Sequence, residues 1–214
     1  MSYIENIYIC LVAPLLIAVL CTKGRGRRSL TFIVCGMTSC ILSSYISTFI
    51  AAANNAGILT ASMTIAPLVE EVLKILPALF FLLVFEPDNR SITDCVIMIS
   101  IGFSTFENVC YMTQSGTSRL LHLLIRGFGT GAMHVICGLM VAYGMVYLWD
   151  KLWLRVAGII GLVSAAITYH GIYNILVSQN GAVALIGYII PVFTAVIIEI
   201  IKRSSSTAQK DEAP

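Results

Sequence analysis

Seven apolar stretches, each about 20 residues long, restrict most strongly what this chain can fold into. An α-helix needs about 20 apolar residues to cross the roughly 30 Å hydrocarbon core of a bilayer. The stretches lie near residues 4–21, 29–53, 65–85, 92–112, 131–149, 156–178 and 182–201. The sequence therefore predicts an all-α, polytopic bundle of about seven transmembrane helices, with the lipid bilayer as its surroundings.

Composition agrees with this prediction and excludes other classes. The 214 residues are 58% hydrophobic and 11% charged, a balance unlike that of water-soluble domains. A net charge of +2, with no basic stripe, gives no indication of a nucleic-acid partner. The seven cysteines include no CxxC pair, so they do not indicate a metal or redox site.

The positions of lysine and arginine predict the orientation. With the N terminus outside, ten of the 13 basic residues fall on the inner side, two fall on the outer side, and Lys74 lies within a span. This distribution follows the positive-inside rule and predicts a cytoplasmic C terminus. Residues 1–203 are then the membrane domain, and the polar segment 204–214 is predicted to be a disordered cytoplasmic tail.

One segment, residues 118–130, allows three interpretations. Arg119, His122 and Arg126 interrupt a stretch that is otherwise apolar. An interfacial helix, a re-entrant segment and the outer end of a long fifth span all agree with this pattern.

Ionisable residues within the spans are the strongest indication of function. Each costs roughly 2.5 to 3.5 kcal/mol at the bilayer centre, so four of them facing lipid would cost on the order of 10 kcal/mol. We expect them to face protein or water instead. The charged residues of this kind are Glu70, Glu71, Lys74 and Glu107, and the weaker polar cases are Asn108, His134, His170 and Asn174.

The alternating directions of the spans bring these residues to one depth. At 1.5 Å of rise per residue, the polar residues of the third to sixth spans lie at a common level beneath the extracytoplasmic surface. We therefore expect a water-accessible cavity among those four spans. Two adjacent glutamates beside one lysine need not titrate alike, so either Glu70 or Glu71 can act as a general base and the other as the partner of Lys74.

Such a cluster can hydrolyse a peptide bond within the membrane. Hydrolysis needs an activated water, donors for the oxyanion and a path for water. The chain has no HExxH motif for zinc, no GxGD motif, and only an incomplete GxS match at residues 102–104. These absences favour a glutamate-type protease among the known intramembrane types.

Four motifs in order resemble those of the PrsW family, which is related to the CAAX prenyl-endopeptidase and bacteriocin-processing superfamily. They are EEVLK at residues 70–74, GFSTFEN at 102–108, the segment 126–134 that ends in a histidine, and HGIYN at 170–174. The resemblance covers about residues 65–178, with each motif on its own span. It implies a multi-pass protease of a bacterial cytoplasmic membrane that makes the site-1 cut in a single-span anti-sigma factor near the outer membrane face.

The resemblance also implies residue roles. One of the two glutamates would activate water, and His170 with Asn174 would stabilise the oxyanion. The chain departs from the prenyl-endopeptidase pattern at Glu107, where that pattern has a histidine, and at Lys74, which stands one residue before the pattern's arginine. We expect His134 to replace the missing imidazole.

The remaining roles follow from position. Glu107 is expected to orient His134 or to share its proton, and Lys74 to fix the charge of the glutamate pair. Arg126, Asn108 and Phe103 are predicted to contact substrate. No cofactor is predicted; glutamate and histidine can bind metals, but no recognisable zinc geometry follows from the spacing, so metal dependence stays open.

Three other interpretations compete with a protease. The polar residues can form a structural ion-pair network between helices, or the chain can be a non-catalytic immunity or scaffold protein. A proton- or cation-coupled transporter is the third, but it predicts polar residues along the whole path, and the inner halves of these spans have almost none.

Overall fold

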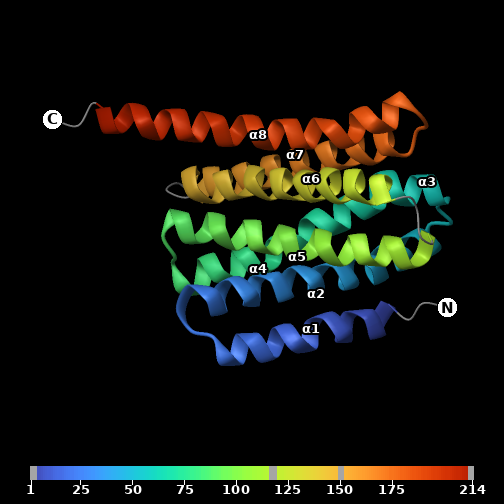
Figure 1. The fold of residues 1–214 in the computed structure, drawn as a ribbon, viewed down its shortest axis with the longest axis horizontal. Helices are drawn as coiled ribbons and strands as arrows, with labels where there is room; N and C mark the ends of the chain where they lie inside the picture. The colour runs from blue at the N-terminus through green and yellow to red at the C-terminus, as the bar shows by residue number, and fades with distance from the viewer. Residues whose placement is uncertain (1–3, 116–119, 149–151, 212–214) are drawn as a thin grey trace.

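The computed structural model describes residues 4–115, 120–148 and 152–211, and within these the side chains of Ser115, Leu152, Arg155 and residues 201–211 lie outside the description. Seven helices of 18 residues or more form a bundle, and the described residues contain no strand. Figure 1 shows these helices lying roughly side by side, with the two ends of the chain at opposite ends of the bundle. The long helices are α1 (Ile4–Cys21), α2 (Gly24–Ala53), α4 (Ala66–Phe85), α5 (Asn89–Ser115), α6 (Leu120–Tyr147), α7 (Leu152–Val177) and α8 (Ala182–Asp211).

These helices confirm the predicted all-α polytopic bundle. All except α4 are long and apolar enough to cross a membrane. Helix α4 has 20 residues but carries three charged side chains. Because α6 begins at Leu120, the segment 118–130 belongs, as far as it is described, to the N-terminal end of a long fifth span, the end predicted to be the outer one.

The predicted tail and orientation remain predictions. The backbone of α8 continues as a helix to Asp211, into the segment expected to be disordered, and residues 212–214 lie outside the described residues.

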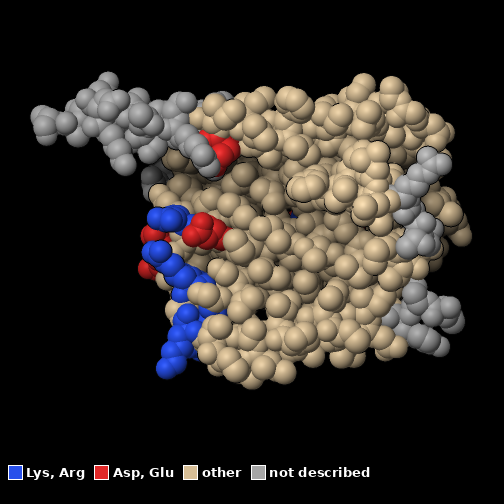
Figure 2. Space-filling view, viewed as in Figure 1, with Lys and Arg blue, Asp and Glu red and all other residues tan. Residues whose placement is uncertain are grey.

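Figure 2 shows that the charged side chains visible on this face gather at one end of the bundle. The α1–α2 connection, the first two turns of α2 and the start of α5, which carry Lys23, Arg25, Arg27, Arg28 and Arg90, lie at that end (Figure 1). This distribution agrees with the positive-inside argument but does not test it.

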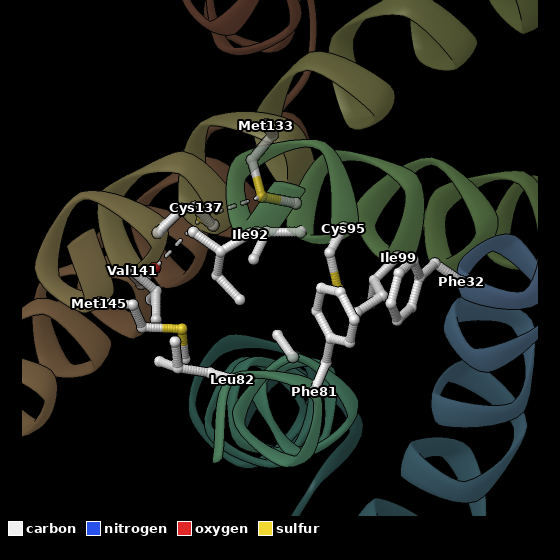
Figure 3. Packing of buried hydrophobic residues seen from close by; sticks show 14 of the residues in the cluster. Phe32, Phe81, Leu82, Ile92, Cys95, Ile99, Met133, Cys137, Val141 and Met145 are labelled. Carbon is white, nitrogen blue, oxygen red and sulfur yellow. Dashed lines mark hydrogen bonds between the residues drawn. The ribbon is translucent and has the colours of Figure 1, made fainter. Parts of the chain in front are cut away.

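An apolar cluster fixes α4 against its neighbours. Figure 3 shows Phe81 and Leu82 of α4 facing buried side chains of α5 and α6. The ring of Phe32, from α2, packs edge-on against Phe81 with centroids 5.0 Å apart. Burial of these side chains stabilises α4. Because Glu71 and Lys74 lie two to three turns earlier on the same helix, the cluster also sets their position.

Two glycines bring the backbones of α2 and α5 into direct contact. A Cβ on Gly36 would lie 2.0 Å from the carbonyl oxygen of Ile99, and a Cβ on Gly102 would lie 2.1 Å from that of Ile33. Neither helix can accept a side chain at these points without moving apart. The small residues therefore allow the close approach that membrane helices use in place of a hydrophobic driving force.

We expect Gly102→Ala to destabilise the protein by about 1 to 3 kcal/mol, because the new methyl group overlaps the backbone of α2. Reversible unfolding in mixed micelles measures this loss. Gly161→Ala on α7 is the matched control, since nothing lies within 4 Å of its added Cβ. Equal stability of the two variants would show that α2 and α5 do not touch as described.

Candidate active site

The start of α4 departs from regular helix geometry just before the two glutamates. A single α-helical turn, α3 (Ile58–Thr60), and a π-helix, η1 (Ala61–Ile65), lead into α4. The Asn174 side chain on α7 donates a hydrogen bond from Nδ2 to the Ser62 carbonyl oxygen at 2.8 Å. π-Helical turns are frequent at functional sites. Here the turn and its tie to α7 set the direction in which α4 begins.

A buried network joins α4, α6 and α7. Glu71 Oε1 accepts a hydrogen bond from Lys74 Nζ at 2.7 Å and another from His170 Nδ1 at 2.7 Å. Lys74 Nζ also lies 2.8 Å from His134 Nδ1. All four side chains are buried. An ion pair held by further hydrogen bonds is the arrangement in which buried charges are tolerated.

The network continues from His134 to α5 and to the N-terminal end of α6. His134 Nε2 lies 2.6 Å from Glu107 Oε2, and Glu107 Oε1 accepts a hydrogen bond from Arg126 at 3.1 Å. The Arg126 guanidinium lies over the Tyr111 ring, 3.6 Å from its centroid. Because an ammonium group can only donate, His134 Nδ1 accepts from Lys74 and Nε2–H donates to Glu107. Glu107 therefore contacts the His134 ring on the side opposite Lys74, the contact that its predicted role requires.

Glu70 differs from its neighbour in having a free oxygen. Its Oε2 is buried without a hydrogen-bond partner and lies 3.7 Å from His170 Nε2. His170 Nδ1–H donates to the Glu71 carboxylate, so Nε2 of the neutral ring is an acceptor. A polar contact longer than 3.5 Å is where a bridging water belongs. Glu70 Oε2 and His170 Nε2 thus face one another without a direct hydrogen bond between them.

A cleft of about 290 Å³ opens to the surface beside Glu70. Glu70, Glu107 and Arg126 line it, together with a row of hydroxyl side chains on α2: Ser43, Ser44, Ser47 and Thr48. The sequence predicts a cavity among the third to sixth spans; instead, α2 forms one wall and no residue of α7 lines the cleft. The tight α2–α5 contact is the reason, because it brings α2 beside Glu107.

Three residues predicted to act at the site have different surroundings. Phe103 is fully buried and packs behind His134, with ring centroids 4.9 Å apart, so its placement does not support a substrate contact. Asn174 donates one amide hydrogen bond to the Ser62 carbonyl oxygen, which ties α7 to η1. Asn108 lies beside Glu107 on α5, and its Oδ1 is buried without a partner.

Sequence reasoning missed the contribution of α2 and of Tyr111. A signal for α2 exists, because Ser39, Ser43 and Ser47 recur every four residues and so share one helix face. Tyr111 is four residues after Glu107, and the Arg126 guanidinium packs against the face of its ring. That contact depends on where α6 crosses α5, which no spacing within one helix reveals.

Fold and site together define a polytopic membrane protein with a polar site buried among its helices, an arrangement suited to hydrolysis inside the bilayer. Residues 27–200 match the sequence model of the PrsW family intramembrane metalloprotease, and the chain belongs to this family. It is therefore a multi-pass membrane protease, which confirms the resemblance noted in the sequence. Neither the curated proteins nor the solved structures include a match.

The family description implies a metal, and the residues present fit one. Glu70, His134 and His170 each offer a ligand atom, and these atoms lie within 4.8 Å of one another. Two imidazoles and a carboxylate are a donor set of catalytic zinc sites, and the Glu71 contact to His170 Nδ1 is the usual support of a ligating histidine. To bind a metal ion, His134 would have to lose its hydrogen bond with either Lys74 or Glu107.

Proposed function

We propose that this protein is a glutamate-type intramembrane endopeptidase in which Glu70 is the carboxylate that activates water. The single observation supporting this assignment is the free, buried Oε2 of Glu70 beside the cleft. Glu71, by contrast, is held by Lys74 and His170 and does not line the cleft. Glu71 and Lys74 are then positioning residues.

The reaction follows from these contacts. A water molecule between Glu70 Oε2 and His170 Nε2 donates a hydrogen bond to each. As its oxygen bonds to the peptide carbonyl carbon, Glu70 takes its proton, and the carbonyl oxygen becomes an oxyanion. Arg126, whose Nε has no partner and which lines the cleft, stabilises that oxyanion. The proton then passes from Glu70 to the leaving nitrogen as the C–N bond breaks.

A metal-dependent form of the same site involves the same residues. Glu70, His134 and His170 would hold the ion, which would supply an activated water and polarise the carbonyl. Glu71 would still orient His170 in that form, and Glu107 would remain beside Arg126. A chelator separates the two forms.

The proposed substrate is a single-span membrane protein such as an anti-sigma factor. The cleft is lined by residues near the N terminus and the start of α4, at the end of the bundle away from the visible charged residues (Figures 1 and 2). Under the positive-inside rule this end faces the extracytoplasmic side of a bacterial cytoplasmic membrane. The α2 hydroxyl groups offer hydrogen-bond partners to an extended peptide, whose backbone groups need them in an apolar environment.

A transporter is less well supported by the interior of the bundle. The apolar cluster shown in Figure 3 fills the space between α4, α5 and α6 on the side of the network toward the end of α4. Ion transport needs polar groups or water through that region. Hydrolysis needs only a polar cleft that opens at one end of the bundle, and the site has such a cleft.

We expect cleavage of a single-span substrate by the purified wild-type protein to change by less than about twofold when a strong chelator is added, because Glu70 itself acts as the base. Initial rates in detergent, measured over a panel of single-span proteins, test this expectation. Glu86→Gln is a control for the preparation, since Glu86 is exposed on the α4–α5 connection. Loss of activity that returns with added Zn²⁺ would reject the glutamate-type mechanism and retain the protease.

A further inference from the structure

A second, larger groove opens at the other end of the bundle from the active-site cleft. It runs between the first three turns of α2, the later half of α4 and the α4–α5 connection, with a volume of about 860 Å³. Its walls are largely apolar and include Thr31, Phe32 and Cys35 of α2, and Phe80, Phe81 and Phe85 of α4. This volume is within the usual range for small-molecule sites. It contains none of the residues of the proposed catalytic site.

The mouth of this groove is basic. Arg27 and Arg28 line it and are exposed, and neither forms an ion pair within the described part of the chain. Asp88 lines it as well, but its Oδ1 accepts a hydrogen bond from the Ser91 backbone N–H at 3.3 Å. Hydrogen bonding by Ser91, with a smaller contribution from Arg28, lowers the pKa of Asp88. Two arginines against one aspartate leave the mouth with net positive charge.

Charge and apolar surface follow one another along α2. Arg28 is in the first two turns of α2, which begins at the charged end of the bundle (Figures 1 and 2), and Cys35 lies two turns further along the helix among apolar side chains. At 1.5 Å per residue this separation is about 10 Å, which leads from the headgroup region into the hydrocarbon. A molecule that fits this order has an anionic head and an apolar chain.

We propose that this groove binds an anionic phospholipid, with its phosphate between Arg27 and Arg28 and an acyl chain along Phe32, Phe80 and Phe81. Charge complementarity favours this occupant over the span of a protein substrate. Single-span proteins carry their own lysines and arginines on the cytoplasmic side, where the same rule places this end. Their positive flanks would be repelled by the two arginines.

Occupancy of the groove connects to the rest of the fold through α4. Phe81 belongs to the apolar cluster and contacts Phe32 across the groove wall. Pro77, which also lines the groove, is one turn after Lys74. A bound lipid therefore holds together α2 and the helix that carries the glutamates, and it raises the stability of the folded chain by mass action.

The test uses the purified full chain in a neutral detergent. Phosphatidylglycerol and phosphatidylcholine with identical acyl chains are titrated, and the apparent Kd is taken from the rise in Tm. We expect a rise with phosphatidylglycerol that phosphatidylcholine or inorganic phosphate alone does not produce. Arg27→Gln/Arg28→Gln is expected to weaken phosphatidylglycerol binding by about 30-fold.

The matched control removes the same charge from the same segment. Lys23→Gln/Arg25→Gln also loses two positive charges, but neither residue lines the groove, so its Kd is expected to change by less than about threefold. Thr31→Trp fills the groove without changing its charge and is expected to abolish the lipid-dependent rise. Equal losses in the two double variants, no preference between the lipids, or the same rise with inorganic phosphate would each overturn the proposal.

Discussion

Glu70→Gln is expected to lower the rate of substrate cleavage by about 100- to 10,000-fold, the usual contribution of a general base. The amide cannot accept the proton of the attacking water, yet it has nearly the shape of the carboxylate. Because no hydrogen bond holds Oε2 of Glu70, the substitution breaks none, and the fold should persist. Initial rates with a cleaved single-span substrate, together with Tm, measure both effects.

Glu71→Gln separates the two glutamates. It too should lose activity, but with a lower Tm, because the Glu71 carboxylate holds both Lys74 and His170. Glu86→Gln, an exposed change of the same kind, should keep wild-type activity. If Glu70→Gln cleaved at the wild-type rate while Glu71→Gln was inactive and fully stable, the base would be Glu71 and the assignment from the cleft would be wrong.

Lys74→Met is expected to destabilise the protein by about 3 to 5 kcal/mol, because it leaves the Glu71 carboxylate buried without its cation. It also removes the donor to His134 Nδ1, so the orientation of that ring toward Glu107 is lost. Reversible unfolding in mixed micelles gives the free energy. Val72→Met, on the exposed side of the same helix, is a control of similar size.

A double variant shows whether the loss arises from the unpaired charge. Glu71→Gln/Lys74→Met removes both charges and should recover part of the stability lost in Lys74→Met, since an uncharged buried site avoids most of the desolvation cost. Activity should not return. No recovery in the double variant would mean that packing of the lysine stem, and not its charge, stabilises α4.

Much of this organisation is present in the sequence. The apolar stretches predict the bundle because the thickness of a bilayer sets the length of a span. The intramembrane glutamates, Lys74 and the histidines predict a polar site because charged groups facing lipid are costly. A common depth is predicted by counting residues along antiparallel helices, and the structure brings Glu70, Glu71, Lys74, Glu107, Arg126, His134 and His170 together in one network.

Only the tertiary structure distinguishes the two adjacent glutamates. Successive residues on a helix point about 100° apart, so Glu70 and Glu71 face different neighbours, and which one meets the cleft depends on how α4 is rotated. That rotation is set by packing at Phe81 and Leu82 and by the entry through η1, both of which involve residues distant in sequence.

Packing between helices also decided which residues of different helices meet at the site. The sequence determined that this chain is a helical membrane protein with a polar site of carboxylates and imidazoles. The close contact of α2 with α5 at Gly36 and Gly102 makes α2 a wall of the cleft. The crossing of α5 and α6 places Arg126 over Tyr111. Periodicity within a helix predicts which residues share a face, but the neighbour of that face depends on side-chain volumes of other helices.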